Sequence, residues 1–331
     1  MSEKILIITD NLPDQINGVV TTFSNIKKLA ERDGYQVFNI DPSGFRYINA
    51  PGYPEVKLTL PWGIGRRIKE IAPDYIHIAT EGPLGLAARL WCDWNGLRYN
   101  TSYHTRFPEF LKKIYGIPEF LTYRYVRWFH KHSGRVLTTT RTMVKELEDQ
   151  GFRSDIISWT RGVDRKIFCQ GLRTTTDGYL LSVGRVSREK GLDDFCNLPW
   201  PGRKVIVGDG PYRKELERRY PNIEFVGSKR GEELARYYAN ASVFVFTSRT
   251  DTFGVVIIEA LAMGTPVAAY SVPGPVDIIE PGINGYMSED LLDNVNRCCL
   301  LDRSLVEKSS SKWTWENCWQ IFKNNLIDSG L

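Results

Sequence analysis

The sequence predicts an α/β protein built from two doubly wound, Rossmann-like domains. Short apolar runs of strand length alternate with longer helical patterns, and this alternation is typical of a parallel sheet with helices on both faces. The alternation breaks off in a polar stretch and then starts again. The length of 331 residues suits two domains of ordinary size. Because ligands bind at the carboxyl ends of such strands, we expect the two domains to face each other across a cleft.

The first domain is expected over residues 1–165. It opens with an apolar run at 4–10, typical of a buried parallel strand, and a helical pattern follows at about 19–30. The other strands expected in this domain are 35–40, 75–79, 97–103 and 135–139. The other helices expected in it are 65–71, 83–94, 118–132 and 142–150.

Residues 166–178 are polar and include three consecutive threonines, so we place the linker there. The second domain is expected over residues 179–303, and the aromatic-rich residues 304–331 are expected to form a helix that crosses back to the first domain. The strands expected in the second domain are 179–183, 204–207, 223–226, 243–246 and 266–270. The helices expected in it are 212–219, 232–240 and 254–263.

Composition places the chain among ordinary globular proteins. Hydrophobic residues make up 42% and charged residues 25%, which is a normal balance. The formal net charge is +4. A charge of this size is compatible with anionic partners such as nucleotide phosphates, a membrane surface or nucleic acid, and it requires none of them.

The six cysteines form no CxxC pair and no cluster with histidine. Neither a zinc site nor a disulfide framework is therefore indicated, and reduced thiols in the cytoplasm are the simpler interpretation. The first residues run directly into a strand without a signal-peptide pattern, and the apolar runs are too short to span a bilayer. We expect a cytoplasmic protein whose contact with a membrane is at most peripheral.

A basic turn follows the first strand of the second domain. It contains Gly184, Arg185 and Lys190. A strand that ends in glycine lets the backbone approach a ligand. Two cations beside backbone N–H groups suit a diphosphate, whose charge must be neutralised when it leaves. The alternative is a solvated basic loop without a ligand.

The second motif is a polar loop that leads into a buried helix. Phe253 and Gly254 end the loop, and the helix after them is apolar almost all round. We expect its first amides, those of Val255 and Val256, to bind phosphate oxygens. Glu259 lies one turn further on, where a buried carboxylate needs hydrogen-bond donors and ribose hydroxyls would serve. The alternative for this carboxylate is a salt bridge with a core arginine or lysine.

Together the two motifs resemble the family 4 retaining glycosyltransferases of the GT-B fold. The signature of that family has two acids with seven residues between them, Phe-Gly after the first acid, and an upstream Gly-Arg…Lys-Gly. In this chain the two acids are Asp251 and Glu259. The family's first acid is glutamate, so the side chain of Asp251 is one methylene shorter. The resemblance implies that Asp251 contacts hydroxyls of the transferred sugar, and the shorter side chain puts the choice of sugar in doubt.

Other segments extend the resemblance over nearly the whole chain. Gly208 lies in a turn at a strand end, and Val226 lies where family members hold the nucleotide base through backbone groups. Gly18 lies in a loop similar to the one that faces the diphosphate. His104, in Tyr-His-Thr-Arg-Phe-Pro, resembles the histidine that touches the sugar. A lone histidine at a strand end is more often structural, as we expect for His77.

The acceptor side is less specific. Arg106, Arg161 and Asp164 lie in segments that resemble bacterial transferases acting on diacylglycerol-type lipids, and we place them on the acceptor side. Residues 107–132 combine aromatic side chains with cations. These suit a membrane interface, a nucleic-acid backbone with stacked bases, or simply a solvated helix face. The cations are Lys112, Lys113, Arg124, Arg127 and Lys131.

The resemblance implies retaining transfer of a hexose or related sugar from a nucleoside diphosphate sugar, expected to be UDP-linked. The expected acceptor is the hydroxyl of a membrane lipid. The predicted catalytic residues are Arg185, Lys190, His104 and Asp251. Because the two cations and the helix amides would stabilise the leaving diphosphate, we expect no divalent metal and no cofactor.

Two alternatives stay open, and no obligate protein partner is indicated. One is a glycosyltransferase that acts on a hydroxymethylated DNA base. The other is a non-catalytic module that only binds a nucleotide sugar. A dinucleotide-dependent dehydrogenase is disfavoured, because no Gly-x-Gly-x-x-Gly follows the first strand.

Overall fold

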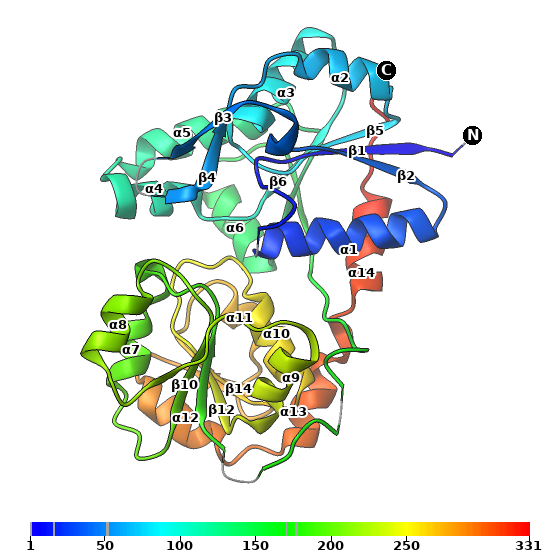
Figure 1. The fold of residues 1–331 in the computed structure, drawn as a ribbon. Helices are drawn as coiled ribbons and strands as arrows, with labels where there is room; N and C mark the ends of the chain where they lie inside the picture. The colour runs from blue at the N-terminus through cyan, green and yellow to red at the C-terminus, as the bar shows by residue number, and fades with distance from the viewer. Residues whose placement is uncertain (1, 16, 51–52, 170, 176–177) are drawn as a thin grey trace. The chain divides into compact units, whose positions relative to one another are not determined.

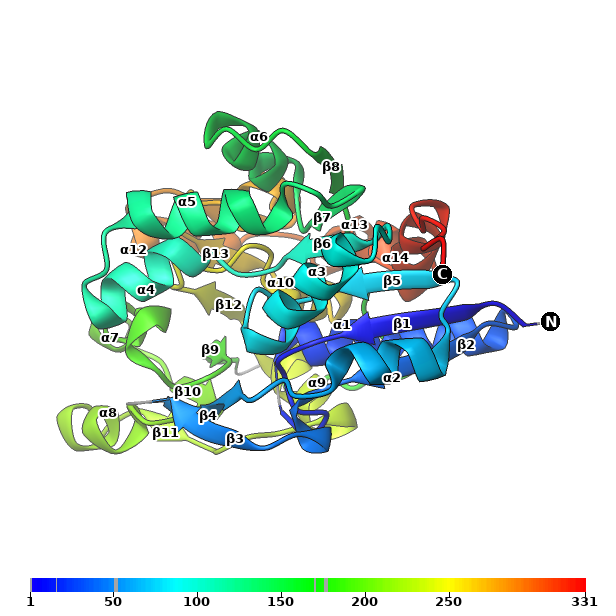
Figure 2. The ribbon, with the colours of Figure 1, turned by 90° about the horizontal axis from the view of Figure 1, so that it is seen from above.

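The computed structural model describes residues 2–15, 17–50, 53–169, 171–175 and 178–331. The chain forms two compact units. Unit 1 is Met1–Thr160 with Trp315–Leu331, and unit 2 is Arg161–Thr314. Each unit has its own parallel sheet with helices around it (Figures 1 and 2).

The sheet of unit 1 has the strand order β2-β1-β5-β6-β7-β8, and every neighbouring pair is parallel. The strands are β1 (Lys4–Ile8), β2 (Gln36–Ile40), β5 (Tyr75–Ile78), β6 (Asn100–Tyr103), β7 (Arg135–Thr138) and β8 (Asp155–Ser158). A separate antiparallel pair is formed by β3 (Tyr47–Ala50) and β4 (Tyr53–Thr59). The sequence prediction lacks β8, β3 and β4.

Helices cover both faces of this sheet. The helices of unit 1 are α1 (Gly18–Arg32), α2 (Ile64–Ile71), α3 (Pro83–Trp94), α4 (Phe107–Tyr115), α5 (Glu119–His130), α6 (Arg141–Asp149) and α14 (Trp315–Asn324). Around Ile5 and Ile7 the sheet packs against α1 and α14, whereas around Leu6 and Ile8 it packs against α2, α3 and α5 (Figure 1). Successive side chains of a strand point to opposite faces. The continuous apolar run of β1 therefore contributes side chains to the hydrophobic cores on both faces of the sheet.

The sheet of unit 2 has the order β11-β10-β9-β12-β13-β14, again with parallel neighbours. Its strands are β9 (Leu180–Val183), β10 (Lys204–Val207), β11 (Glu224–Phe225), β12 (Val243–Phe246), β13 (Val267–Ala269) and β14 (Gly285–Met287). Its helices are α7 (Leu192–Asn197), α8 (Arg213–Arg219), α9 (Gly231–Asn240), α10 (Val255–Ala262), α11 (Pro275–Ile278), α12 (Leu291–Cys298) and α13 (Arg303–Ser309). Leu180 faces the core under α7, α8 and α12, and Leu181 faces the core under α9 and α10.

The segment expected as a linker packs in part onto unit 2. Phe168 is buried in the unit 2 core together with Val163, and its N–H donates to the carbonyl of Asp164 at 2.8 Å. The N–H of Val163 donates to the carbonyl of Trp313 at 3.2 Å. These contacts bring the start of unit 2 to Arg161, a few residues before the expected domain end at 165.

The C-terminal residues 304–331 contain two α-helices where the sequence predicts one. The first, α13, packs against α10 in unit 2, and the second, α14, packs against α1 in unit 1. Trp319 and Phe322 of α14 join the core around β1, and Trp319 Nε1 donates to a carboxylate oxygen of Asp33 at 2.8 Å. Most of the aromatic residues noted in the sequence therefore belong to α14, whereas Trp313 lies in unit 2.

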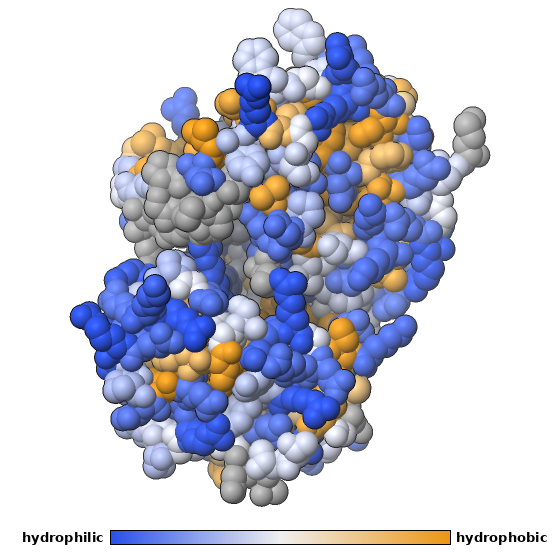
Figure 3. All heavy atoms as spheres, viewed as in Figure 1, coloured by the Kyte–Doolittle hydropathy of each residue, from blue (hydrophilic) through white to orange (hydrophobic). Residues whose placement is uncertain are grey.

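On the face drawn in Figure 3, hydrophilic side chains predominate and hydrophobic ones form separate spots. Single exposed apolar side chains are normal on a protein surface. None of the helices in the described part of the chain combines the length and the apolar character that a membrane crossing requires. All six cysteines are free thiols.

Candidate functional site

Two glycine turns meet at the carboxyl ends of β9 and β10. Gly184 follows β9 and Gly208 follows β10, with φ angles of +145° and +146°. A Cβ atom on Gly208 would lie 1.8 Å from the carbonyl oxygen of Gly184, so no other residue fits there. The Gly184 N–H donates to the Val207 carbonyl at 2.9 Å. The two predicted turns are thus packed backbone to backbone, at the sheet edge where doubly wound domains bind ligands.

Lys190 lies in a turn that is fixed against the end of β12. The hydroxyl of Thr247 donates to the Lys190 carbonyl at 2.7 Å. Gly191 has a φ of +64°, and a Cβ on it would lie 2.9 Å from the Thr247 carbonyl oxygen. The Lys190 side chain points to Asp251, with Nζ 2.6 Å from Oδ1. The structure therefore brings the predicted diphosphate lysine and the predicted sugar-binding acid together.

The helix α10 begins directly after the loop that carries Asp251. Its N-cap, Gly254, has a left-handed φ of +84°, and Phe253 packs edge-on against Trp313 with ring centroids 5.4 Å apart. The first N–H groups of an α-helix have no acceptor within the helix, and that end carries a partial positive charge. The amides of Val255 and Val256 thus lie where a phosphate oxygen would be favoured.

Glu259 lies one turn into α10 and is half-buried beside apolar side chains. The hydroxyl of Tyr238, on α9, donates to its Oε2 atom at 3.0 Å. Burial raises the pKa of Glu259 to about 7, and the hydrogen bond from Tyr238 opposes this rise. Among the described residues no lysine or arginine forms a salt bridge with Glu259, so the structural alternative from the sequence is not observed there.

The remaining donor-side residues occupy the neighbouring strand ends of unit 2. Arg185 follows Gly184 directly and is half-buried. Val226 follows β11, and its N–H donates to the Ile206 carbonyl at 3.1 Å in the sheet. Since that N–H is occupied, a base held at Val226 would have to use its carbonyl.

In unit 1, Gly18 lies after the loop that follows β1, and His104 directly follows β6. Gly18 is the first residue of α1, whose N-cap Asn17 accepts a side-chain hydrogen bond from the Val20 N–H at 2.9 Å. The ring of His104, just after β6, is half-buried and lies 5.6 Å from that of Phe23. Both residues follow the carboxyl ends of their strands, on the side where doubly wound domains bind ligands.

His77 behaves as a structural residue. It is buried in β5, and its Nε2 atom lies 2.6 Å from the hydroxyl of Ser102. Burial lowers the pKa of His77 to about 3. The ring is therefore neutral at physiological pH, as the sequence interpretation requires.

Arg106 is engaged by carboxylates of its own unit. Its guanidinium lies 2.5 Å from Glu146 and 3.4 Å from Glu109. The hydroxyl of Tyr123 donates to Glu109 at 2.7 Å. This cluster links α4, α5 and α6, so Arg106 has a structural role. Contact between Arg106 and an acceptor stays a prediction.

Arg161 and Asp164 lie in unit 2, whereas the sequence places them at the end of the first domain. Arg161 is buried, with 3% of its surface exposed. The Asp164 carboxylate accepts a hydrogen bond from the N–H of Lys166 at 2.9 Å, which shapes a local turn. A role of either residue on the acceptor side stays a prediction.

The basic and aromatic residues of 107–132 are spread over α4 and α5. Lys112 pairs with Glu119 at 3.0 Å, and Arg127 donates to the Gln150 carbonyl at 2.8 Å. Arg124 and Lys131 are exposed. The side chain of Lys113 lies outside the described part of the chain.

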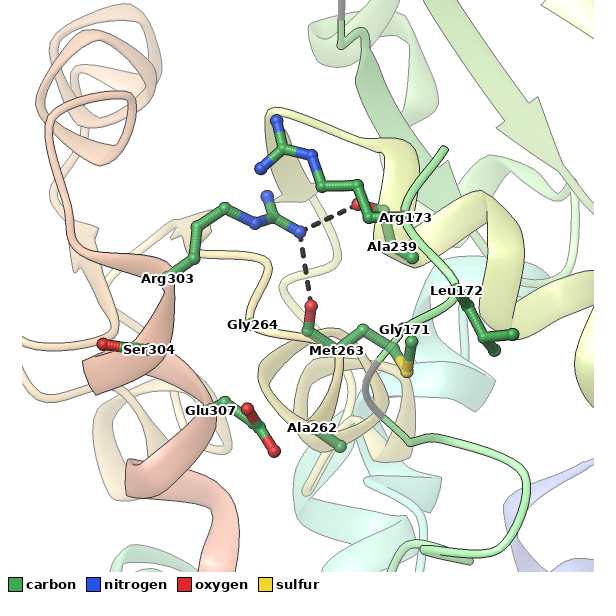
Figure 4. A pocket seen from close by; sticks show the side chains of 10 residues that line it. All are labelled: Gly171, Leu172, Arg173, Ala239, Ala262, Met263, Gly264, Arg303, Ser304 and Glu307. Carbon is green, nitrogen blue, oxygen red and sulfur yellow. Dashed lines mark hydrogen bonds between the residues drawn. The ribbon is translucent and has the colours of Figure 1, made fainter. Parts of the chain in front are cut away.

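A separate pocket of about 340 Å³ lies at the opposite end of α10 (Figure 4). Arg303 lines this pocket, and its guanidinium donates hydrogen bonds to the carbonyls of Ala239, Ala241 and Met263 at 2.8–3.2 Å. These carbonyls end α9 and α10, so Arg303 caps both helices at their negative ends. Burial lowers the pKa of Arg303 to about 10. Arg303 therefore stabilises the helix that carries the candidate site, and the pocket lies at the other end of that helix.

Sequence reasoning missed Tyr238 and Thr247, which hold Glu259 and the Lys190 turn. A tyrosine on an amphipathic helix and a threonine after a strand are ordinary core patterns. Their partners are distant in sequence, so no local signal marks them.

Comparison with known proteins places the chain in a family. Residues 16–166 match the family described as Glycosyltransferase Family 4, and residues 177–299 match the one described as Glycosyl transferases group 1. A GDP-mannose-dependent α-mannosyltransferase of Mycobacterium tuberculosis is 31% identical in an alignment 319 positions long that covers 86% of this chain and 83% of that protein. This chain is a family 4 glycosyltransferase.

Two further similarities bear on this glycosyltransferase. An α-monoglucosyldiacylglycerol synthase of Streptococcus pneumoniae is 25% identical over 95% of the chain and 82% of that protein. The structure of a sucrose-phosphate synthase from Thermosynechococcus elongatus superposes with a TM-score of 0.79 at 17% identity, covering 97% and 98% of the two chains. The predicted family and the predicted GT-B fold with two Rossmann-like domains are therefore confirmed.

Proposed function

We propose that this glycosyltransferase moves a hexose or related sugar from a nucleoside diphosphate sugar to a hydroxyl acceptor, with retention of anomeric configuration. One observation carries the proposal. The ion pair between Lys190 and Asp251 lies just ahead of the N-terminus of α10, where phosphate is favoured. A cation, an acid able to accept hydrogen bonds from sugar hydroxyls, and the first turn of α10 thus occur close together, although Lys190 and Asp251 belong to different loops.

The chemistry follows from the charges around that loop. Breaking the bond between the sugar and the diphosphate leaves negative charge on the β-phosphate, and Arg185, Lys190 and the α10 amides would stabilise it. In the front-face route, an oxygen of the departing diphosphate helps to deprotonate the acceptor hydroxyl. Because fixed cations and amides would neutralise this charge, we propose that no divalent metal is required.

The donor has two candidates. UDP-linked hexose is the expectation from sequence. GDP-mannose is the second, and it is supported by the name of the mycobacterial relative that is 31% identical. Slow release of free sugar by the purified enzyme, followed separately for UDP-glucose, UDP-galactose and GDP-mannose, tests both. Release from none of the three would contradict the proposed donor class.

We propose a lipid hydroxyl at an anionic membrane surface as the acceptor. The named activity of the pneumococcal relative supports a lipid. On α4 and α5, Phe120 is 70% exposed and Trp128 is 42% exposed, and Lys112, Arg124 and Lys131 lie exposed among them. Aromatic and basic side chains in this combination suit a membrane interface. No observation favours a DNA acceptor, and we expect the enzyme to act in the cytoplasm with peripheral membrane contact.

The acceptor proposal is tested with the purified enzyme, a donor that it hydrolyses, and two acceptor preparations. One is a vesicle that contains diacylglycerol and an anionic phospholipid, and the other is DNA with hydroxymethylated bases. Mass spectrometry of the products shows which acceptor gains a sugar. A glycosylated lipid supports the proposal, and glycosylated DNA without glycosylated lipid overturns it.

A further inference from the structure

Tyr238 of α9 is fully buried and lies directly against Glu259 of α10. Its hydroxyl donates to Glu259 Oε2 at 3.0 Å, and 0% of its surface is exposed. The Tyr238 carbonyl accepts a hydrogen bond from the Thr265 hydroxyl at 2.6 Å. Its ring packs edge-on against Phe244, with centroids 5.6 Å apart. The phenol is therefore fixed by its own hydrogen bond and by the packing of its ring, while the Thr265 hydrogen bond holds the backbone of Tyr238.

The Glu259 carboxylate depends on that hydrogen bond. An ionised carboxylate among apolar side chains is unfavourable unless donors satisfy it. The helices packed against α10 carry other charged groups. These are Glu232, Glu233 and Arg236 on α9, Asp277 on α11, Arg303, Glu307 and Lys308 on α13, and Lys312 just after α13. Among the described residues none of these forms a hydrogen bond or ion pair with Glu259. The donor for Oε2 is a neutral phenol, and no described residue donates a hydrogen bond to Oε1.

We propose that Tyr238 is a positioning residue, which keeps the Glu259 carboxylate ionised and orients it to accept hydrogen bonds from the ribose hydroxyls of the nucleotide sugar. The inference rests on the proposed function, since it assigns a part of the same donor site. Tyr238 itself touches neither the sugar nor the reacting atoms.

A pH dependence follows from this arrangement. Burial raises the pKa of Glu259 to about 7 and the Tyr238 hydrogen bond lowers it, so loss of the phenol hydroxyl raises it further. Ribose hydroxyls are held best by the ionised form, and donor affinity should fall as pH falls through that pKa. In Tyr238→Phe the midpoint of this fall should move to higher pH by about one unit. At pH 7 the affinity should then be weaker by roughly fivefold.

The test is the dissociation constant of a nucleotide sugar, UDP-glucose or GDP-mannose, measured by calorimetry from about pH 5.5 to 8.5. A nucleotide sugar is used because a free terminal phosphate would itself titrate near pH 6. The matched control is Tyr237→Phe, which removes a hydroxyl from the neighbouring half-buried tyrosine of α9 without touching Glu259. A second reference is Glu259→Gln, which has no carboxyl to titrate and should give a flat profile.

The proposal requires three results together. The wild-type profile falls near pH 7, Tyr237→Phe keeps that midpoint, and Tyr238→Phe shifts it upward. An unshifted midpoint in a folded Tyr238→Phe protein overturns the role of Tyr238 alone. A wild-type affinity that does not change with pH also overturns it. This measurement needs no variant, so the proposal can be tested even if Tyr238→Phe does not fold. Absence of nucleotide-sugar binding at every pH overturns the proposed function instead.

Discussion

The Nζ atom of Lys190 lies 2.6 Å from Oδ1 of Asp251, and 26% of each side chain is exposed. The pair joins two residues that the family resemblance assigns to different parts of one donor, the diphosphate and the sugar. A bound donor would offer Lys190 a more highly charged partner than a single carboxylate. We therefore expect donor binding to loosen this pair and to free Asp251 for the sugar hydroxyls.

Replacement of Lys190 or Arg185 by alanine should lower turnover by about two to three orders of magnitude, as loss of charge stabilisation at a leaving group does. The measurement is kcat for donor hydrolysis at saturating donor. Lys229→Ala is the control, because Lys229 forms an ion pair of the same 2.6 Å length with Glu233 and is 23% exposed. Near-normal turnover in both Lys190→Ala and Arg185→Ala would remove the diphosphate assignment.

Asp251→Glu restores the side-chain length of the family's first acid. Because the longer carboxylate reaches different hydroxyls, the ratio of kcat/KM between two sugars on one nucleotide should change by roughly tenfold. A panel of hexoses on the accepted nucleotide measures that ratio. Asp293→Glu, on the exposed side of α12, serves as control. An unchanged sugar preference would mean that Asp251 does not select the sugar.

Glu259→Gln should weaken nucleotide binding with a smaller effect on kcat, because an amide accepts fewer hydrogen bonds from ribose than a carboxylate does. Calorimetry with the nucleotide alone and steady-state kinetics separate the two effects. If nucleotide affinity is the same as in the wild type, Glu259 is a structural residue of α10.

The same substitution should change how stability depends on pH. The folded-state pKa of Glu259 is about 7, above the ordinary value of about 4.3. The folded protein thus binds more protons than the unfolded chain between these values, and its free energy of unfolding falls as pH rises through this window. The loss amounts to at most ~4 kcal/mol over the whole window. Urea unfolding at about pH 5 and pH 8 should show a smaller decrease in Glu259→Gln, and equal decreases in both proteins would refute this assignment.

Replacement of the α4–α5 cations by glutamine should release the enzyme from anionic vesicles, because each cation near such a surface contributes about 1 kcal/mol at low salt. Transfer to a lipid should slow while donor hydrolysis is unchanged, since these side chains are expected to bind no part of the donor. The replaced residues are Lys112, Lys113, Arg124, Arg127 and Lys131. Vesicle sedimentation and donor hydrolysis are measured on the same preparation.

The control for that variant carries an equal loss of charge on exposed positions of unit 2. Its replaced residues are Lys214, Arg218, Arg236, Arg297 and Lys308. DNA binding is titrated with salt alongside, because the same cations would also weaken binding to phosphates. If the α4–α5 variant and this control bind vesicles equally well, the α4–α5 cations are a solvated face.

Local pattern was sufficient for most of the parallel strands and for the order of the motifs, but not for β8 or β14. The apolar runs that became β1, β9 and β12 are buried on both sides, and such strands have a continuous hydrophobic signal. The glycines at 184, 208 and 254 are explained by positive φ angles that other residues rarely adopt. By contrast, β8 carries half-buried side chains, and the β3–β4 pair lies outside both parallel sheets. Neither has the periodicity of a buried strand.

The sequence by itself determined the fold class and the family, and it predicted the donor-side residues, because each motif consists of residues that are close together in the chain. Tertiary structure alone decided which of them touch. Lys190 meets Asp251 across 61 residues, and Tyr238 meets Glu259 across 21. It also assigned Arg161 and Asp164 to unit 2, through the burial of Val163 and Phe168. Such contacts depend on how strands and helices pack against each other, and local periodicity and spacing carry no record of that packing.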